Sequence, residues 1–224
     1  MEHDELSGPH KEIIAEALDG LKSTLPYVIG IGGGAGVGKT TFANSLQNAL
    51  ECKGKNAIVL HLDDFFKSPE ERQRIGTEWD ENHVNLAEVR RVLESIRRGD
   101  SQITKLKYNR TTKKIEAETL ELSGVDVVIF EGIYAISNEA RLGNFLEFVD
   151  LPVFISAKLS DIKKRRFRQE SEKPHPRTKE QMERHWNRGI LPDLRKNILP
   201  SKKNARFIID VDSNRNFSIT SQCI

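Results

Sequence analysis

Short apolar runs recur along the chain, and stretches with helical spacing lie between them. The five runs cover residues 27–31, 57–62, 125–130, 149–155 and 207–211. Nearly continuous apolar strands are buried on both faces, which is typical of a parallel sheet that helices cover on both sides. The pattern therefore predicts an α/β domain with a doubly wound, mostly parallel sheet of about five strands.

Three segments between these runs carry their apolar residues on one helical face. The spacing i, i+3, i+4, i+7 predicts helices over 11–22, 40–50 and 86–98, and Gly99 supplies a stop for the last of them. Residues 102–122 alternate instead, so we expect a β-hairpin inserted into the α/β pattern. One side of its first strand would carry Thr104, Leu106 and Tyr108.

Composition and charge limit the possible classes of protein. The 224 residues are 37% hydrophobic and 30% charged, which predicts a folded, soluble domain. A net charge of +2 gives no global reason to expect nucleic acid or a membrane surface as a partner. The start of the chain, residues 1–5, is acidic and not apolar, and Cys52 and Cys223 have no metal-site spacing. We therefore expect a cytoplasmic protein without a signal peptide.

The most specific motif follows the first apolar run and fits G-x-x-x-x-G-K-[ST]. In a strand–loop–helix context its backbone N–H groups cradle phosphates, its lysine reaches the terminal phosphates, and its hydroxyl binds Mg²⁺. A dinucleotide fingerprint that starts at Gly30 also fits, but it leaves Lys39 and Thr40 unexplained. The residues expected to bind the phosphates of a nucleotide cofactor are Gly33, Gly34, Ala35, Gly36, Val37, Gly38, Lys39, Thr40 and Thr41, with Lys39 also a catalytic candidate.

Acidic residues stand directly after two other apolar runs. In an α/β sheet ligands bind at the carboxyl ends of the strands, so Asp63 and Asp64 should face a phosphate acceptor. One carboxylate there can orient and deprotonate a hydroxyl. Glu131 occupies a Walker-B-like position that can hold Mg²⁺. The alternative is a capping aspartate pair and a solvated glutamate without chemistry.

A basic run lies between the last two apolar runs, at Lys163, Lys164, Arg165, Arg166 and Arg168, with Arg177 following. Such a run is often only a solvated helix face. Beside a phosphate-binding loop, however, arginines on a lid neutralise the charge that develops on a transferred phosphoryl group. Residues 160–180 are therefore a candidate lid, with Arg166 and Arg168 as catalytic candidates and Arg177 as a phosphate contact.

Together these residues resemble the uridine kinase and phosphoribulokinase family of P-loop kinases, from about residue 26 to 212. The matching segments are Gly33 to Thr41, Leu62 to Phe66, Phe130 to Ile133, Arg165 to Arg177 and Leu199 to Ala205. The resemblance implies a core of five parallel strands, with ATP and Mg²⁺ as cofactors. It further implies that Asp63 is the base, that Thr40 and Glu131 serve the metal with Asp63 beside them, and that the three arginines contact phosphates.

The length of 224 residues predicts a single domain with insertions, and together with the resemblance we expect one P-loop kinase domain over residues 1–224. Its parts would be an N-terminal helix in 1–25, an ATP-binding core in 26–62, an acceptor segment with the hairpin in 64–122, and the lid in 160–180. By analogy with the family, the protein is a possible homo-oligomer.

The acceptor is the open part of this assignment. Uridine kinases usually carry a Tyr-Asp pair and a histidine in the hairpin, whereas this hairpin offers Tyr108, Asn109 and Arg110. We expect acceptor contacts from Asp63, His83, Tyr108 and Arg166. A nucleoside such as uridine or cytidine is the first candidate, and pantothenate, nicotinamide riboside, a sugar acid or a sugar phosphate are the others. An ATP-binding regulatory module and a polynucleotide kinase are alternatives from other classes.

Overall fold

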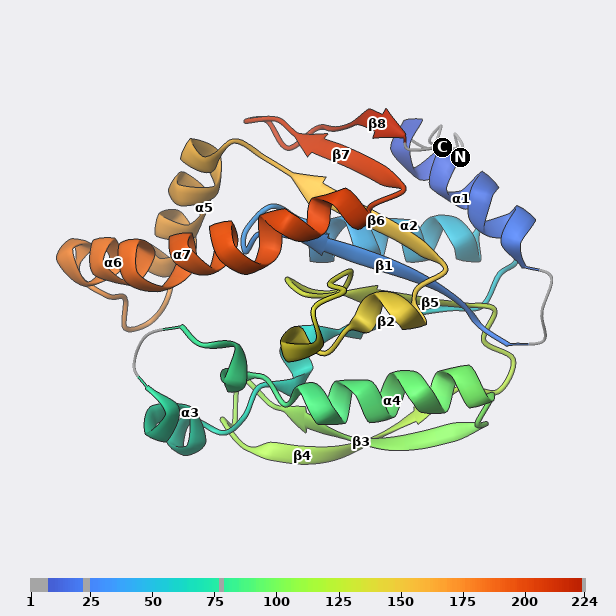
Figure 1. Ribbon diagram of the computed structural model, residues 1–224, viewed down its shortest axis with the longest axis horizontal. Helices are drawn as coiled ribbons and strands as arrows, with labels where there is room; N and C mark the ends of the chain where they lie inside the picture. Colours follow the sequence, from blue (N-terminus) through green and yellow to red (C-terminus); the bar gives the residue numbers. More distant parts are fainter. Residues whose placement is uncertain (1–7, 22–24, 77–78, 223–224) are drawn as a thin grey trace.

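A six-stranded sheet forms the centre of the molecule in a computed structural model that describes residues 8–21, 25–76 and 79–222 (Figure 1). The strand order is β2-β5-β1-β6-β7-β8. Five strands are parallel, and β8 pairs antiparallel with β7 at the edge. The strands are β1 (Tyr27–Gly33), β2 (Ala57–His61), β5 (Val127–Glu131), β6 (Leu151–Ser156), β7 (Phe207–Val211) and β8 (Phe217–Gln222). The prediction of a doubly wound, mostly parallel sheet is confirmed.

The register of the central strands brings three predicted strand ends to one edge of the sheet. Ile31, two residues before the end of β1, pairs with Glu131 at the end of β5, and His61 at the end of β2 pairs with Glu131 from the other side. The side chains of β5 are all buried, which explains why its sequence is apolar without alternation until the glutamate. The loop after β1, the aspartates after β2 and the glutamate that ends β5 therefore lie together at the carboxyl ends of the parallel strands.

Helices cover the sheet with their apolar faces. Helix α1 (Gly8–Gly20) packs on α2 (Lys39–Glu51), and α4 (Leu86–Arg98) lies between the sheet and the hairpin (Figure 1). Helix α4 has the predicted bounds because Asn85 caps its first turn and Gly99, at φ +78°, ends it. Helix α1 begins and ends earlier than predicted. Residues 1–7, 22–24 and Cys223 of the sequence predictions lie outside the described residues.

The predicted hairpin is present as β3 (Gln102–Tyr108) and β4 (Ile115–Glu121), a separate two-stranded sheet. Thr104 and Leu106 share one side of β3 as expected, but that side is exposed. The buried side carries Ile103 and Lys105 instead. A buried lysine needs an anionic partner, and Asp64 after β2 and Glu118 of β4 supply it, each at 2.8 Å from Lys105 Nζ.

The remaining helices lie around the carboxyl ends of the parallel strands (Figure 1). They are α3 (Pro69–Ile75), α5 (Leu159–Ser171), α6 (Lys179–His185) and α7 (Leu191–Asp193). The chain also has short 3₁₀ segments, which are η1 (Leu62–Phe65), η2 (Glu81–His83), η3 (Ala140–Leu142), η4 (Phe145–Phe148) and η7 (Leu199–Asn204). Two π-helical segments, η5 (Trp186–Ile190) and η6 (Leu194–Ile198), continue α6 and α7. Within the described ranges, no helix is both long and apolar enough to cross a membrane.

Candidate active site

The loop between β1 and α2 has the backbone that a phosphate-binding loop requires. Gly33, Gly36 and Gly38 have φ angles of +139°, +84° and +105°, a region that residues with a Cβ rarely adopt. A Cβ on Gly33 would also stand 2.3 Å from the carbonyl oxygen of Ile155. These positions therefore need glycine, which explains the spacing of the sequence motif in terms of backbone shape.

Lys39 begins α2 and is buried beneath this loop. Its Nζ donates a hydrogen bond to the carbonyl oxygen of Gly34 at 3.0 Å. Burial lowers the pKa of the Lys39 amine, and the nearby carboxylates of Glu131 and Asp63 oppose that shift. The ammonium is thus already held inside the loop, where it can contact a phosphate group.

Thr40 and Glu131 form the candidate Mg²⁺ site. The Thr40 hydroxyl donates to Glu131 Oε1 at 2.9 Å, and Glu131 is 5% exposed. The described residues contain no group of three or more metal-ligating side chains. This donor set fits Mg²⁺ nevertheless, because a nucleotide-bound Mg²⁺ takes only one or two protein oxygens and completes its shell with phosphates and water. Asp63, the third residue expected at the metal, pairs with Arg110 instead.

His61 is a neighbour of this site that the sequence analysis missed. Its Nδ1 lies 2.8 Å from Glu131 Oε1, and this hydrogen bond raises the pKa of His61. Burial alone would raise the pKa of Glu131, but His61, Lys39 and Thr40 outweigh it, so the pKa lies below the ordinary value. Glu131 is therefore ionised at neutral pH, as a Mg²⁺ ligand must be.

The His61–Glu131 pair makes the stability of the fold depend on pH. The pKa of His61 is higher in the folded state than in the unfolded state, where it is 6.5. The contribution of the pair to the free energy of unfolding is therefore fully present below pH 6.5, and it is lost as the pH rises through the folded pKa. His61→Gln keeps a neutral donor and removes the charge. We expect the wild type to be more stable than His61→Gln by about 1 kcal/mol at about pH 6, and equally stable at about pH 9. Urea unfolding at both pH values measures this, and a difference that stays constant would contradict it.

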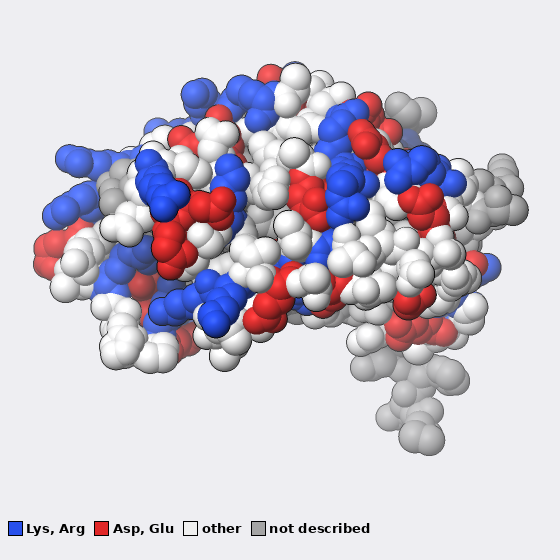
Figure 2. Space-filling model, turned by 90° about the horizontal axis from the view of Figure 1, so that it is seen from below, with Lys and Arg blue, Asp and Glu red and all other residues white. Residues whose placement is uncertain are grey.

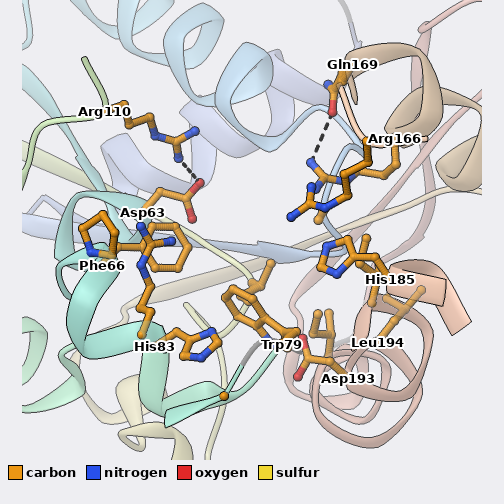
Figure 3. Close-up of a pocket in the computed structure, with 18 of the residues that line it drawn as sticks. Asp63, Phe66, Trp79, His83, Arg110, Arg166, Gln169, His185, Asp193 and Leu194 are labelled. Atoms are coloured by element: carbon orange, nitrogen blue, oxygen red, sulfur yellow. Dashed lines mark hydrogen bonds and ion pairs between the residues drawn. The ribbon is translucent and has the colours of Figure 1, made fainter. Parts of the chain in front are cut away.

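The two aspartates after β2 have different surroundings. Asp64 Oδ2 accepts a hydrogen bond from the buried Lys105 Nζ at 2.8 Å and lies 3.7 Å from Lys107 Nζ. Asp64 therefore fastens the hairpin to the strand end. Asp63 is half-exposed and pairs with Arg110, at the tip of the hairpin, at 2.5 Å (Figure 3). Only Asp63 lines the cavity described next.

A cavity of about 930 Å³ opens beside the phosphate-binding loop. In Figure 3, Asp63, Phe66 and His83 stand on one side of it, Arg166 and His185 on the other, and Trp79 between them. This volume is at the upper end of the range for small-molecule sites, so it can hold the phosphates of a nucleotide together with an acceptor. Asp63, Arg166 and Ala35 of the loop all line it.

Two of the lining residues, Trp79 and Asp193, belong to a hydrogen-bond network. Tyr134 donates its hydroxyl hydrogen to Asp193 Oδ1 at 2.7 Å, and Trp79 Nε1 donates to the Tyr134 oxygen at 3.2 Å. Asn197 Nδ2 also donates to Asp193 Oδ1, at 2.7 Å. Burial raises the pKa of both Tyr134 and Asp193. The network joins the segment after α3 to the helices after the lid and fixes the position of Trp79.

A second cavity, of about 110 Å³, is lined by other residues of the phosphate-binding loop, Gly36, Val37 and Gly38. Thr41, Val211 and Phe217 line it together with Arg165, whose guanidinium donates to the Asp212 carbonyl at 2.5 Å. The Phe217 ring also packs against Phe42 of α2, with centroids 5.0 Å apart. No residue of this cavity except those of the loop was assigned a role from sequence.

The predicted lid residues do not all reach the large cavity. Arg166 lines it, and burial lowers the pKa of its guanidinium. Arg177 lines it as well and pairs with Glu170 at 3.1 Å. Arg168 is exposed, pairs with Glu172 at 3.4 Å and is not among the lining residues that the structure describes. In an α-helix, side chains at positions i and i+2 are rotated by about 200° around the helix axis, so Arg166 and Arg168 point to opposite sides of α5.

His83 and Tyr108 were also predicted to contact the acceptor, and the structure brings one of them to the cavity. His83 lines it, whereas Tyr108 is not among the lining residues described. Tyr108 stands behind Arg72 of α3, with the guanidinium carbon 4.9 Å from its ring centroid. Arg72 and Arg110 are lining residues that sequence reasoning did not assign, because no local pattern marks them.

Comparisons with known proteins agree with this geometry. Residues 28–218 match the phosphoribulokinase / uridine kinase family, so the chain belongs to that family. It is 27% identical to a uridine kinase of Saccharomyces cerevisiae over 192 residues, which cover 83% of this chain and 37% of that enzyme. A uridine kinase of Ureaplasma urealyticum is also 27% identical, with 80% of this chain and 86% of that enzyme covered.

Solved structures share the fold at lower identity. A D-glycerate 3-kinase from Cryptococcus neoformans superposes with a TM-score of 0.67 at 17% identity, covering 96% of this chain and 99% of that one. The chain thus has the family and the fold of a phosphotransferase whose acceptor is a hydroxyl group, and this family implies ATP as the phosphate donor.

Proposed function

We propose that this protein is an ATP- and Mg²⁺-dependent kinase that transfers the γ-phosphoryl group to a hydroxyl of a small metabolite. The observation that carries the proposal is the large cavity, where the Asp63 carboxylate shares one space with the phosphate-binding loop and the lid. Phosphoryl transfer needs mainly positioning and charge stabilisation, and the residues of this cavity supply both.

Each residue has a role that its surroundings support. The loop N–H groups and Lys39 would hold the β- and γ-phosphates, and Thr40 and Glu131 would hold Mg²⁺, which neutralises charge on the phosphate oxygens. Asp63 would orient the acceptor hydroxyl and take its proton. Arg166 would stabilise charge on the transferred group, with Arg177 at the phosphates. The adenine would lie in the second cavity, against Phe217.

Acceptor-dependent release of ADP tests the proposal. The panel contains uridine, cytidine, nicotinamide riboside, pantothenate, D-glycerate and ribulose 5-phosphate, each with ATP and Mg²⁺. We expect one acceptor to stimulate ADP release in the wild type. An ATP-binding protein whose turnover no acceptor stimulates would instead be the regulatory module, and the kinase proposal would fail.

The other sequence predictions remain part of the proposal. A polynucleotide acceptor needs a continuous basic groove, but Figure 2 shows Lys and Arg interspersed with Asp and Glu over the face that it displays. We therefore keep a small molecule as the acceptor. A cytoplasmic location, the division of the chain into core, acceptor segment and lid, and a homo-oligomer stay predictions.

A further inference from the structure

The large cavity is lined by more positive charge than the lid alone explains. Its basic side chains are Arg72, Arg110, Arg166, Lys173 and Arg177, and its acidic ones are Asp63 and Asp193. Among them, Arg110 is paired with Asp63, and both Lys173 and Arg177 are paired with Glu170. Arg72 and Arg166 form no ion pair with any described residue. Arg166 belongs to the lid, so Arg72 is the charge that the proposed transfer of phosphate leaves without a role.

Arg72 is held in place by aromatic rings rather than by a carboxylate. Its guanidinium carbon lies 5.4 Å from the ring centroid of Phe66 and 4.9 Å from that of Tyr108. Its Nε is buried and has no hydrogen-bond partner in the described structure. The capping box of Ser68 and Glu71 fixes the first turn of α3, from which Arg72 projects. A guanidinium held against two aromatic rings is a preorganised, bidentate donor for an oxyanion.

His83 lies close to Arg72 and, like Arg72, has one buried ring or side-chain nitrogen without a hydrogen-bond partner among the described residues. Its Nε2 is buried without a hydrogen-bond partner in the described part of the chain. Burial lowers the pKa of His83, the positive charge of Arg72 adds to the shift, and Asp80 opposes it. His83 is therefore neutral at pH 7 and can share a ligand with Arg72 without adding charge. Figure 3 shows His83 and Phe66 on the opposite side of the cavity from Arg166.

We propose that the acceptor of this kinase carries an oxyanion, a carboxylate or a phosphate, and that Arg72 binds it while the reacting hydroxyl lies at Asp63. This inference rests on the proposed function and names the class of its substrate as hydroxy acids and sugar phosphates. A neutral nucleoside would leave Arg72 without a counter-charge when the lid excludes water, and such a charge is costly in a closed site. An anionic acceptor removes that cost, and the lid cations stay available to the nucleotide.

Direct binding and turnover of matched variants test the inference. D-glycerate and pantothenate serve as carboxylate probes, ribulose 5-phosphate as the phosphate probe, and uridine as the neutral probe, each added to protein with ADP and Mg²⁺ in a calorimetric titration. We expect an anionic probe to bind the wild type, and Arg72→Gln to weaken that binding about 30-fold while the affinity for ADP is unchanged. Arg74→Gln is the matched control, because Arg74 is exposed on the same helix and is outside the cavity lining.

The outcomes separate this inference from the proposed function. The probe that binds Arg72→Gln more weakly than the wild type shows whether the anionic group of the acceptor is a carboxylate or a phosphate. If uridine binds and turns over equally in wild type and Arg72→Gln, or if none of the anionic probes binds in an Arg72-dependent way, the inference is overturned while the kinase proposal stands. Arg72-dependent binding of an anion without ADP release from ATP for any acceptor would overturn the kinase proposal and leave the anion site in place.

Discussion

Lys39→Met is expected to lower kcat for ADP release about a thousand-fold, the largest effect of any single change we consider. The ammonium of Lys39 is buried under the phosphate-binding loop and is held by the Gly34 carbonyl, so it is positioned before a nucleotide arrives. Charge on the transferred group is stabilised most strongly by donors that are already oriented in a site with little water. Methionine keeps the length and most of the apolar stem but supplies no charge.

The same variant should keep its fold, because the only hydrogen bond of the Lys39 side chain among the described residues is that to Gly34. Lys53→Met is the control: Lys53 is exposed just beyond the far end of α2 and should retain the wild-type kcat. The measurements are kcat at saturating acceptor and the urea midpoint of each variant. Lys39→Met with a wild-type midpoint and a kcat within about tenfold of wild type would remove Lys39 from the catalytic machinery.

The parallel sheet could be predicted because its strands carry their own evidence. A strand buried on both faces has to be apolar throughout, and β5 shows this over all of its residues up to the final glutamate. Strand β8 was missed for the converse reason. It is an edge strand in which Phe217 and Ile219 alternate with polar residues, and such a short alternating segment at the end of a chain does not stand out from a loop.

The phosphate-binding loop could be located for the same local reason. All its residues are consecutive, and its backbone shape requires glycine at fixed positions, so the sequence records the geometry directly. The carboxylates at the strand ends were also local features, since the end of a strand is visible as the end of an apolar run. What the run does not show is which of two adjacent aspartates turns to the cavity.

The rest of the site depends on contacts between distant segments. Asp64 turns away because Lys105, from the hairpin, takes it, and Asp63 meets Arg110 from the tip of the same hairpin. Arg72 is brought to the cavity by the packing of α3 beside Phe66 and Tyr108. The sequence predicted the hairpin, but not which of its faces is buried. Which face is buried decides where the charged side chains of the hairpin point, and a local sequence pattern does not show this.

Asp63→Asn is expected to lower kcat several hundred-fold with little change in the KM for ATP. A carboxylate that takes the hydroxyl proton of the acceptor contributes about 10²- to 10⁴-fold to such reactions, and an amide cannot accept that proton. The asparagine side chain would still fill the same space. The ion pair with Arg110 is lost, but both side chains are about half-exposed or more, so this pair contributes at most about 1 kcal/mol to stability. The variant should therefore fold and bind nucleotide normally.

Asp64→Asn supplies the contrast that makes this prediction specific. Asp64 is one of two carboxylates at 2.8 Å from the buried Lys105 Nζ, the other being Glu118, so Asp64→Asn leaves a buried cation only partly compensated. The change should lower the free energy of unfolding by about 2 kcal/mol and leave kcat of the folded fraction near wild type. The two adjacent variants are thus expected to separate activity from stability. Steady-state ADP release with the acceptor found in the panel, together with urea unfolding, measures both. If Asp63→Asn kept kcat and Asp64→Asn lost it, the base would be Asp64, and the hairpin would have to release that carboxylate from Lys105 when the acceptor binds.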